Sequence, residues 1–150
     1  MSPAHLKQQI SDAFNAYAVE GIACFKEQQL DATPVLSHIC FKFTSMETYA
    51  DYVEAARDIG TVTQKYFNGK QVSWCHLKEP LQAGKLKLEW LEMVEPCFEK
   101  NAFDGVDNIG YMMPKMPAAM KLPSTDGKMQ FRCQSLHAST KAMKPAAYCK

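Results

Sequence analysis

The sequence of 150 residues lacks three features that would place it in a specialised class of protein. No apolar run approaches the ~20 residues that span a bilayer, and the N-terminus has no apolar core typical of a signal peptide. With 17 basic and 16 acidic residues the chain has almost no excess charge, so nothing attracts it electrostatically to nucleic acid or to an acidic membrane. We therefore expect a cytoplasmic protein with neither nucleic acid nor a membrane as its partner.

The chain also lacks any Cys-x-x-Cys pair, although it contains six cysteines. Four of the six lie in apolar or alternating stretches, where buried free thiols are typical of a reducing compartment. We predict six thiols and no disulfide. The residues are Cys24, Cys40, Cys75, Cys97, Cys133 and Cys149.

What the chain does contain is the composition of an ordinary globular domain, with 47% hydrophobic and 22% charged residues. Two segments have the apolar spacing of helices. Over 4–29 the spacing shifts once near Gly21, which predicts a loosened or bent helix there. Over 45–59 the pair Thr44 and Glu47 predicts a capping box at the start of the helix.

Alternating segments predict the strands, and the strongest signal is the Asn68-Gly69 turn, which is typical of a two-residue hairpin. We expect this hairpin to end at Glu79-Pro80. From residue 36 to 93 the predicted order is strand, helix and three strands. The predicted strands are 36–43, 61–67, 70–77, 85–93, 108–113 and 128–134.

Glu92 falls in phase with apolar residues, because Leu86, Leu88 and Trp90 precede it at two-residue spacing. A carboxylate on such a face must be paired, protonated or bound to a cation if it is buried. Alternatively, Glu92 ends the strand and reaches water. Together with Trp74, these apolar residues argue against a fully solvated sheet face.

His38 raises the same question, since it lies in phase with Leu36 and Cys40 on a predicted strand. A single strand histidine is more often a hydrogen-bonded structural residue than a ligand. On two other predicted strands, Asn108 and Gln134 lie on the side that carries polar groups, opposite an apolar side. In a curved sheet with helices on its outer face, these polar residues and Glu92 would converge on one cleft.

Four segments carry a resemblance to a known family: SHICFKF, NGKQVSWCHLKEPLQ, LEMVEP and STDGKMQF. In order and spacing they resemble the bacterial YecM family, from about residue 10 to 135. That family has the vicinal-oxygen-chelate fold of glyoxalase I, extradiol dioxygenases and bleomycin-resistance proteins. The resemblance implies an α+β fold with a curved mixed β-sheet of βαβββ type and helices on the outer face.

The resemblance also divides the chain, which we interpret as one domain over 1–150. The dozen residues between Met113 and Asp126 are too few for a complete second module. We therefore expect an N-terminal helical segment (1–35), a complete module (36–95), an abbreviated second module (106–135) and a loosely packed tail (136–150).

By resemblance, the first and last strands of a module each supply one metal ligand, which places His38 and Glu92 at a metal site. Gln134 is expected to be either a further oxygen ligand of the metal or an amide donor to the bound molecule. The chain departs from the family where Asn108 and Gln134 stand in place of histidines. One imidazole, one carboxylate and two amides form a weak site, so we expect a weakly held zinc, manganese, nickel or iron ion. His76 could replace a missing histidine only if it faces the same cleft, and it matches no family ligand.

Three functions stay open at this point. The first is a small-molecule-binding protein with a weakly metal-binding cleft, in which Arg132 attracts an anionic group and Asn108, Trp74 and Trp90 contact the ligand. The second is a metal-dependent lyase, isomerase or hydrolase with Glu92 as ligand or base. The third is a non-catalytic interaction protein with a degenerate site. A homodimer would cover the exposed sheet edges.

Overall fold

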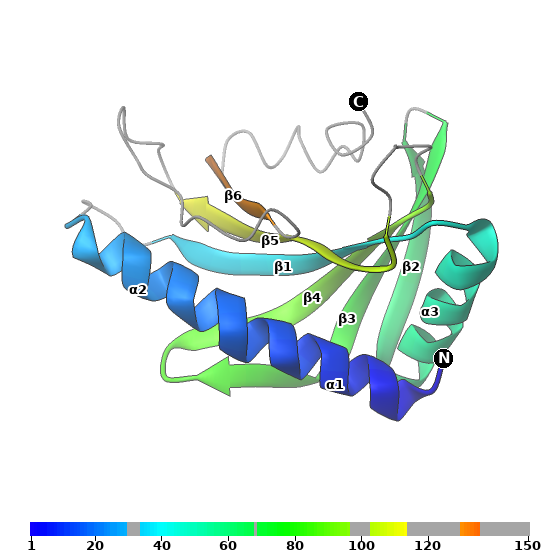
Figure 1. Ribbon diagram of the computed structural model, residues 1–150, viewed down its shortest axis with the longest axis horizontal. Coiled ribbons are helices and arrows are strands. Elements are labelled where there is room, and N and C mark those ends of the chain that lie inside the picture. Colours follow the sequence, from blue (N-terminus) through cyan, green and yellow to red (C-terminus); the bar gives the residue numbers. More distant parts are fainter. Residues whose placement is uncertain (30–33, 68, 97–102, 114–129, 136–150) are drawn as a thin grey trace.

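The computed structural model describes residues 1–29, 34–67, 69–96, 103–113 and 130–135 (Figure 1). It is a mixed α+β fold with one six-stranded mixed sheet, which confirms the predicted fold class. Within the described residues, no helix is both long enough and apolar enough to cross a membrane.

The elements follow the predicted order along the chain. The helical elements are α1 (Pro3–Ala13), the π-helix η1 (Phe14–Ala18), α2 (Val19–Glu27) and α3 (Met46–Ile59). The strands are β1 (Val35–Lys42), β2 (Gly60–Phe67), β3 (Lys70–Ala83), β4 (Leu86–Val94), β5 (Gly105–Met113) and β6 (Gln130–Ser135).

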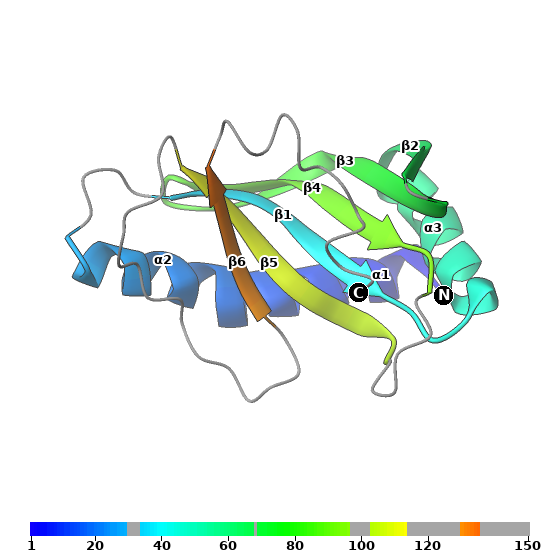
Figure 2. The same cartoon turned by 90° about the horizontal axis from the view of Figure 1, so that it is seen from above.

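The sheet has the order β2-β3-β4-β1-β5-β6, which can be followed in Figure 2. Strand β1 pairs in parallel with β4 and antiparallel with β5, and β6 adds to β5 in parallel. The run β1-α3-β2-β3-β4 is therefore the predicted βαβββ unit. Strands β5 and β6 extend the same sheet beyond β1.

Helices α1, η1 and α2 follow one another without a break and lie along one face of the sheet (Figure 1). Helix α3 packs beside them, and one core joins the helices to that face. Burial of this apolar area is the main source of stability for such a layered fold. Its largest members include Leu6, Phe14, Phe25, Ile39, Phe41, Phe43, Tyr49, Tyr52, Leu88, Leu91, Met93, Ile109 and Tyr111.

The irregularity in the first helix lies at η1, earlier in the chain than the predicted bend at Gly21. The π-turn accommodates the shifted apolar spacing, and Gly21 itself is buried in regular helix. A Cβ atom at Gly21 would collide with the phenol ring of Tyr111. The Tyr111 hydroxyl donates a 2.8 Å hydrogen bond to the carbonyl of Ala18. Gly21 therefore permits β5 and α2 to approach closely.

The predicted capping box at the start of α3 is wrong. Ser45 is the N-cap, and its hydroxyl accepts a 3.1 Å hydrogen bond from the backbone N–H of Thr48. Thr44 instead donates from its backbone N–H and its hydroxyl to the Asp104 carboxylate, at 2.8 and 3.1 Å. Thr44, which local spacing assigned to the cap, thus binds a residue far along the chain instead.

The predicted hairpin is confirmed, because β2 and β3 pair in unbroken antiparallel register up to Phe67 and Lys70. Gly69 has φ +77°, the left-handed conformation that the second position of such a turn requires; Asn68 lies outside the described residues. The predicted end of the hairpin is wrong, since β3 continues through Pro80 to Ala83.

A register shift between β3 and β4 separates the pairs His76–Trp90 and Leu81–Leu88. Because side chains alternate along a strand, such a shift changes which face each residue occupies. Leu86 and Leu88 consequently pack with the helix-side core, whereas Trp90 lies beside His76 and stays 40% exposed. The prediction that all three share one face is wrong.

A second shift interrupts the pairing of β1 with β5 between Leu36 and His38. Leu36 packs into the helix-side core, so it does not share a face with His38 and Cys40 as predicted. The two polar-face residues keep their common phase. A third shift lies between Cys40 and Phe41, so the pairing of β1 with β5 is regular over residues 38–40 only between these two shifts.

The four cysteines in the described part of the chain are free thiols, namely Cys24, Cys40, Cys75 and Cys133. Cys97 and Cys149 lie outside the described residues. Burial raises the pKa of the Cys75 thiol to about 11, which keeps it protonated and poorly reactive. The absence of disulfides from the whole chain stays a prediction.

Candidate functional site

The far face of the sheet, away from α1 and α2, carries a buried polar cluster: His38, Cys40, Glu92 and Asn108. Ile39 and its alternate neighbours pack toward the helices, so His38 and Cys40 point to the opposite side. Cys40 pairs in register with Glu92 on β4 and with Asn108 on β5. Three adjacent strands thus bring these side chains into one row, and Glu92 is only 2% exposed.

The imidazole of His38 and the carboxyl of Glu92 face each other within this buried cluster. Nε2 of His38 and Oε2 of Glu92 are 3.8 Å apart, which is too long for a direct hydrogen bond. Nδ1 of His38 lies 2.9 Å from the hydroxyl of Ser37, while Nε2 has no hydrogen-bond partner. Two donors at this spacing can share a single ion, since zinc-like bonds are ~2.0–2.2 Å long.

A glycine on the neighbouring strand makes room for the His38 ring. Gly110 pairs with His38 across β1 and β5, and a Cβ atom at Gly110 would lie 2.6 Å from Cε1 of the imidazole. The ring therefore occupies the space where any other residue would place its side chain. Sequence reasoning missed Gly110, although a glycine inside a strand can mark such a close approach.

Burial dominates the electrostatics of the pair. It raises the pKa of Glu92 to about 8, against the opposing effects of the Cys40 thiol and the Arg132 charge. Burial and, to a smaller extent, the Arg132 charge together lower the pKa of His38 to about 4. Near pH 7 without a bound cation, the carboxyl is mainly protonated and the imidazole is neutral. The Cys40 thiol, 3.6 Å from Glu92 Oε1, also has a raised pKa because it is buried.

Asn108 completes the cluster on β5 and has no exposed surface. Its Nδ2 donates a 3.0 Å hydrogen bond to Asp107, while its Oδ1 has no partner. Asp107 also pairs with Lys42 at 3.3 Å. The Asn108 amide is thus oriented through its nitrogen, while its oxygen can still accept a hydrogen bond. Sequence reasoning missed the Lys42–Asp107 pair, which helps to hold this amide.

A pocket of about 550 Å³ opens on the same face of the sheet, and we call it the sheet pocket. His38 lines it, whereas Glu92 does not. Trp74 meets the His38 ring edge-on at 5.7 Å, and Trp90 stacks on His76 at 4.5 Å. Leu36 also borders this pocket, although it packs into the helix-side core as well. The lining residues are Leu36, Ser37, His38, Thr63, Lys65, Phe67, Trp74, Lys87, Glu89, Trp90 and Met112.

The structure places the remaining candidate residues at different points. Arg132 pairs with Gly110 in register on β6, and its charge acts on both His38 and Glu92. Gln134 pairs with Met112 by its backbone, but its side chain lies outside the described part of the structure. His76 is exposed and stacks on Trp90, so it does not join the buried cluster.

For a divalent ion, the described residues offer two strong protein donors, His38 Nε2 and the Glu92 carboxyl. No three His, Cys, Asp or Glu side chains converge on one point in the described part of the chain. The unpartnered nitrogen beside a buried carboxyl fits an ion that takes its other ligands from a bound molecule or water.

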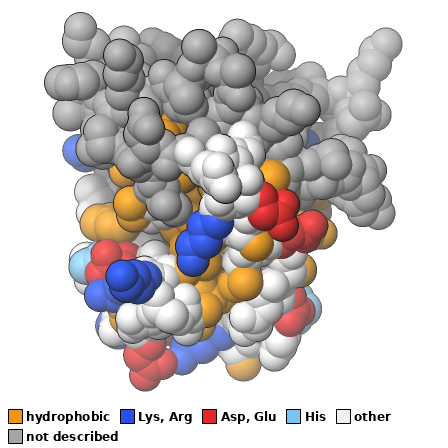
Figure 3. All heavy atoms as spheres, turned by 90° about the vertical axis from the view of Figure 1, so that its left-hand side faces the viewer, with side chains coloured by type: hydrophobic (Ala, Val, Ile, Leu, Met, Phe, Trp, Pro, Cys, Tyr) orange, Lys and Arg blue, Asp and Glu red, His pale blue; other side chains and the backbone are white. Residues whose placement is uncertain are grey.

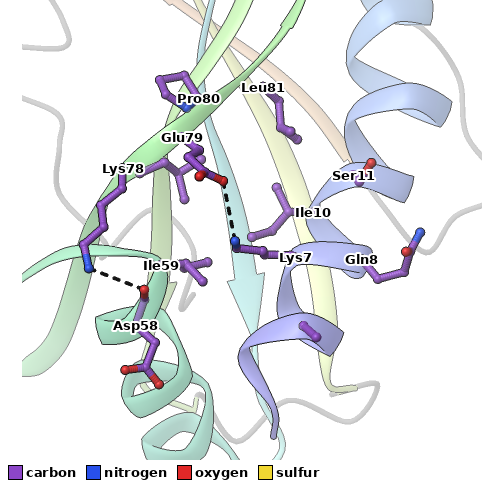
Figure 4. Close-up of a pocket in the computed structure, with 12 residues that line it drawn as sticks. Lys7, Gln8, Ile10, Ser11, Asp58, Ile59, Lys78, Glu79, Pro80 and Leu81 are labelled. Carbon is purple, nitrogen blue, oxygen red and sulfur yellow. Dashed lines mark hydrogen bonds and ion pairs between the residues drawn. The ribbon is translucent and has the colours of Figure 1, made fainter.

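A second pocket, of about 590 Å³, lies on the helix side where β3 shifts register (Figure 4). Lys7 of α1 pairs with Glu79 at 3.6 Å, and Nζ of Lys78 donates to the carbonyl of Asp58 at 3.5 Å. Both lysine ammonium groups therefore already have partners, a carboxylate for Lys7 and a backbone carbonyl for Lys78, beside apolar lining residues. The sheet pocket, next to an unpartnered imidazole nitrogen, is therefore the better-equipped site.

The end of the molecule at the left of Figure 1 is shown in Figure 3, where basic, acidic and apolar side chains intermingle. On this view, the described side chains do not separate into a large patch of one sign. The arrangement agrees with the balanced charge of the sequence.

Comparison with known proteins identifies the fold and no more. No protein-family model matches the chain, and no curated protein matches it. A solved structure titled "Structural Genomics, Protein EC4020" is similar, with a TM-score of 0.60 over 92% of this chain and 92% of that chain. The two are 16% identical, so the likeness supports a shared architecture of helices and mixed sheet without assigning an activity.

Proposed function

We propose that this protein binds a small molecule in the sheet pocket and that His38 and Glu92 together hold a weakly bound divalent metal beside it. When bound, such an ion supplies open coordination positions for an oxygen of the ligand. The contact with Ser37 orients the His38 ring, whose Nε2 atom is one metal donor. The Glu92 carboxylate is the other donor, and its negative charge compensates the cation.

The observation that carries this proposal is the 3.8 Å separation between Nε2 of His38 and Oε2 of Glu92. Both atoms are buried, and the imidazole nitrogen has no hydrogen-bond partner. A buried polar atom without a partner costs roughly 1–3 kcal/mol. An unpartnered buried nitrogen is expected where a bound ion or molecule provides the missing partner.

The position of the pair in the fold gives separate support. His38 lies on β1 and Glu92 on β4, the first and last strands of the βαβββ unit. In the vicinal-oxygen-chelate fold, which the sequence resembles, these are the strands from which ligands come. The weak donor set favours a binding protein over an active metalloenzyme, because Asn108 stands where the family has a histidine.

The direct test is calorimetric titration of the chelator-treated protein with zinc, manganese and nickel. We expect saturable binding of at least one ion to the wild-type protein. Binding should be lost in His38→Ala and in Glu92→Gln, because each variant removes one of the two donors. Metal analysis of protein purified without nickel resin or chelator gives an independent measure.

Two matched variants control for surface effects. His5→Ala removes an exposed imidazole from α1, and Glu54→Gln neutralises an exposed carboxylate on α3. Both should bind metal as the wild type does. Equal metal binding by His38→Ala and the wild type would refute the proposed site.

A second candidate function, an enzyme that moves a proton through Glu92, is favoured by one observation. The pKa of this carboxyl, raised to about 8 by burial, lies in the range of groups that exchange protons near neutral pH. The pocket reaches His38 but does not include Glu92 among its lining residues. Turnover that follows a single ionisation near pH 8 and is absent in Glu92→Gln would favour this alternative.

A further inference from the structure

The chemical class of the ligand can be argued from the walls of the sheet pocket, starting with its two indole rings. The chain has two tryptophans, and both line this pocket. Trp74 pairs with Glu92 and Trp90 with His76 across β3 and β4, so the tryptophans are diagonal neighbours. The backbone positions of diagonal neighbours lie roughly 7–8 Å apart. One bicyclic ring system can therefore contact both indoles.

Each indole is held by a partner ring and leaves part of its surface to the pocket. His76 stacks on Trp90 at 4.5 Å with an interplanar angle of 19°, yet Trp90 stays 40% exposed. His38 meets Trp74 nearly perpendicularly, at 82°. Rings fixed in this way lose little entropy when a flat ligand packs against them. Phe67 and Met112 extend the apolar lining.

The charged residues of the pocket favour an anion. Lys65, Lys87 and Glu89 line it, and Lys87 pairs with Glu89 at 3.2 Å. In the part of the chain that the structure describes, Lys65 forms no ion pair. The lining therefore has one unmatched positive charge, which disfavours the cationic ligands that aromatic pockets otherwise bind.

We propose that the sheet pocket takes a planar aromatic molecule bearing a carboxylate, with its ring between Trp74 and Trp90 and its anionic group toward Lys65. This inference rests on the proposed small-molecule function and adds the ligand class to it. Stacking supplies ring selectivity, and the lysine supplies charge selectivity.

The experiment follows the two indole N–H signals of ¹⁵N-labelled protein by NMR during titration with three probes. 2-Naphthoate is planar and anionic, cyclohexanecarboxylate is anionic but not planar, and benzyltrimethylammonium is aromatic but cationic. We expect 2-naphthoate to shift both indole signals saturably and to bind more tightly than either other probe.

Variants separate the two parts of the recognition. Trp90→Leu should weaken 2-naphthoate binding roughly threefold or more, from lost stacking. Lys65→Met should weaken it roughly two- to fivefold, with a smaller effect at high salt. Tyr66→Leu on the same strand and Lys26→Met on α2 are matched controls that lie outside the pocket lining, and they should bind as the wild type does.

The outcomes distinguish this inference from the proposed function when zinc is titrated into the same samples. Tighter binding of benzyltrimethylammonium, or equal binding of cyclohexanecarboxylate, would overturn the aromatic carboxylate. No saturable shift with 2-naphthoate would overturn it as well, and zinc binding that depends on His38 would then leave the metal site standing. Failure of both titrations would remove the proposed function itself.

Discussion

At the scale of single residues, Glu92 determines the chemistry of the far face. Its side chain is 2% exposed, and a charged carboxylate at such a place is costly unless a cation compensates it. Without a cation, the residue meets this cost by staying protonated, which is the physical meaning of its raised pKa. The same residue can therefore exist as a neutral acid in the empty protein or as an anionic ligand of a metal.

This raised pKa makes the stability of the metal-free protein depend on pH. With a folded pKa of about 8 and an ordinary value of 4.5, Glu92 keeps its proton when folded and loses it when unfolded. The stabilisation of the folded state by this bound proton is complete below the ordinary pKa and is lost as pH rises through the folded pKa. The lowered pKa of His38 acts only below its ordinary value of 6.5.

Urea unfolding in the presence of chelator should detect this effect above the pH range in which His38 titrates. Between about pH 6.5 and 8, the wild type should lose roughly 1–2 kcal/mol of unfolding free energy relative to Glu92→Gln. Glu54→Gln, which alters an exposed carboxylate, should follow the wild-type curve. Parallel curves for the wild type and Glu92→Gln would mean that the Glu92 carboxyl is not buried.

Gly110 is the second residue on which the site depends. Because an added Cβ would lie 2.6 Å from the His38 ring, Gly110→Ala should displace the imidazole from Glu92. We expect a loss of roughly 1–3 kcal/mol in unfolding free energy, as is typical of overpacking. Metal binding should weaken as well.

A matched change separates the ring displacement from a general effect on glycine. Gly84→Ala lies in the β3–β4 turn, where φ is +61° and no atom lies within 4 Å of the added Cβ. This variant pays a conformational cost but should bind metal normally. Wild-type metal affinity in Gly110→Ala would contradict the account of how His38 is positioned.

At the scale of elements, the contact between α2 and β5 explains why a glycine lies inside a buried helix. Tyr111 reaches from β5 to the carbonyl of Ala18, and its phenol occupies the space beside Gly21. The helix loses some intrinsic propensity at Gly21, roughly 1 kcal/mol relative to alanine. The close approach of helix and sheet compensates for this loss.

A double-mutant cycle tests this contact. Gly21→Ala should destabilise the protein by roughly 1–3 kcal/mol, because overpacking outweighs the gain in helix propensity. Tyr111→Phe removes the hydroxyl nearest the added Cβ, so the same change should cost less in that background. Equal costs in the two backgrounds, measured by urea unfolding, would mean that Gly21 and Tyr111 are not coupled.

The same scale shows how much of the fold can be predicted from the sequence. The order of elements and the 68–69 hairpin follow from local periodicity and turn chemistry. The faces of Leu36, Leu86 and Leu88 do not, because each lies beyond a register shift that only strand pairing determines. The cap of α3 also escapes local reasoning, because Asp104 binds Thr44 from a distant segment.

At the scale of the whole molecule, a layered architecture gives the two faces of the sheet different roles. One face builds the core with the helices, and the other carries the buried cluster and the sheet pocket. In the sequence, strand phase and the resemblance to the YecM family both predict that His38 and Glu92 meet, and neither argument needs the other. The role of Gly110 could not be predicted, because it depends on which residue of β5 pairs with His38.

The central claim is that His38 and Glu92 hold one metal ion between them. Anomalous diffraction at the zinc edge, from crystals soaked in zinc, tests it most directly. We expect a peak ~2.0–2.2 Å from both His38 Nε2 and a Glu92 carboxylate oxygen, and no peak there in Glu92→Gln crystals. Well-ordered His38 and Glu92 side chains with no peak between them, in crystals whose surface sites have taken up zinc, would contradict the claim.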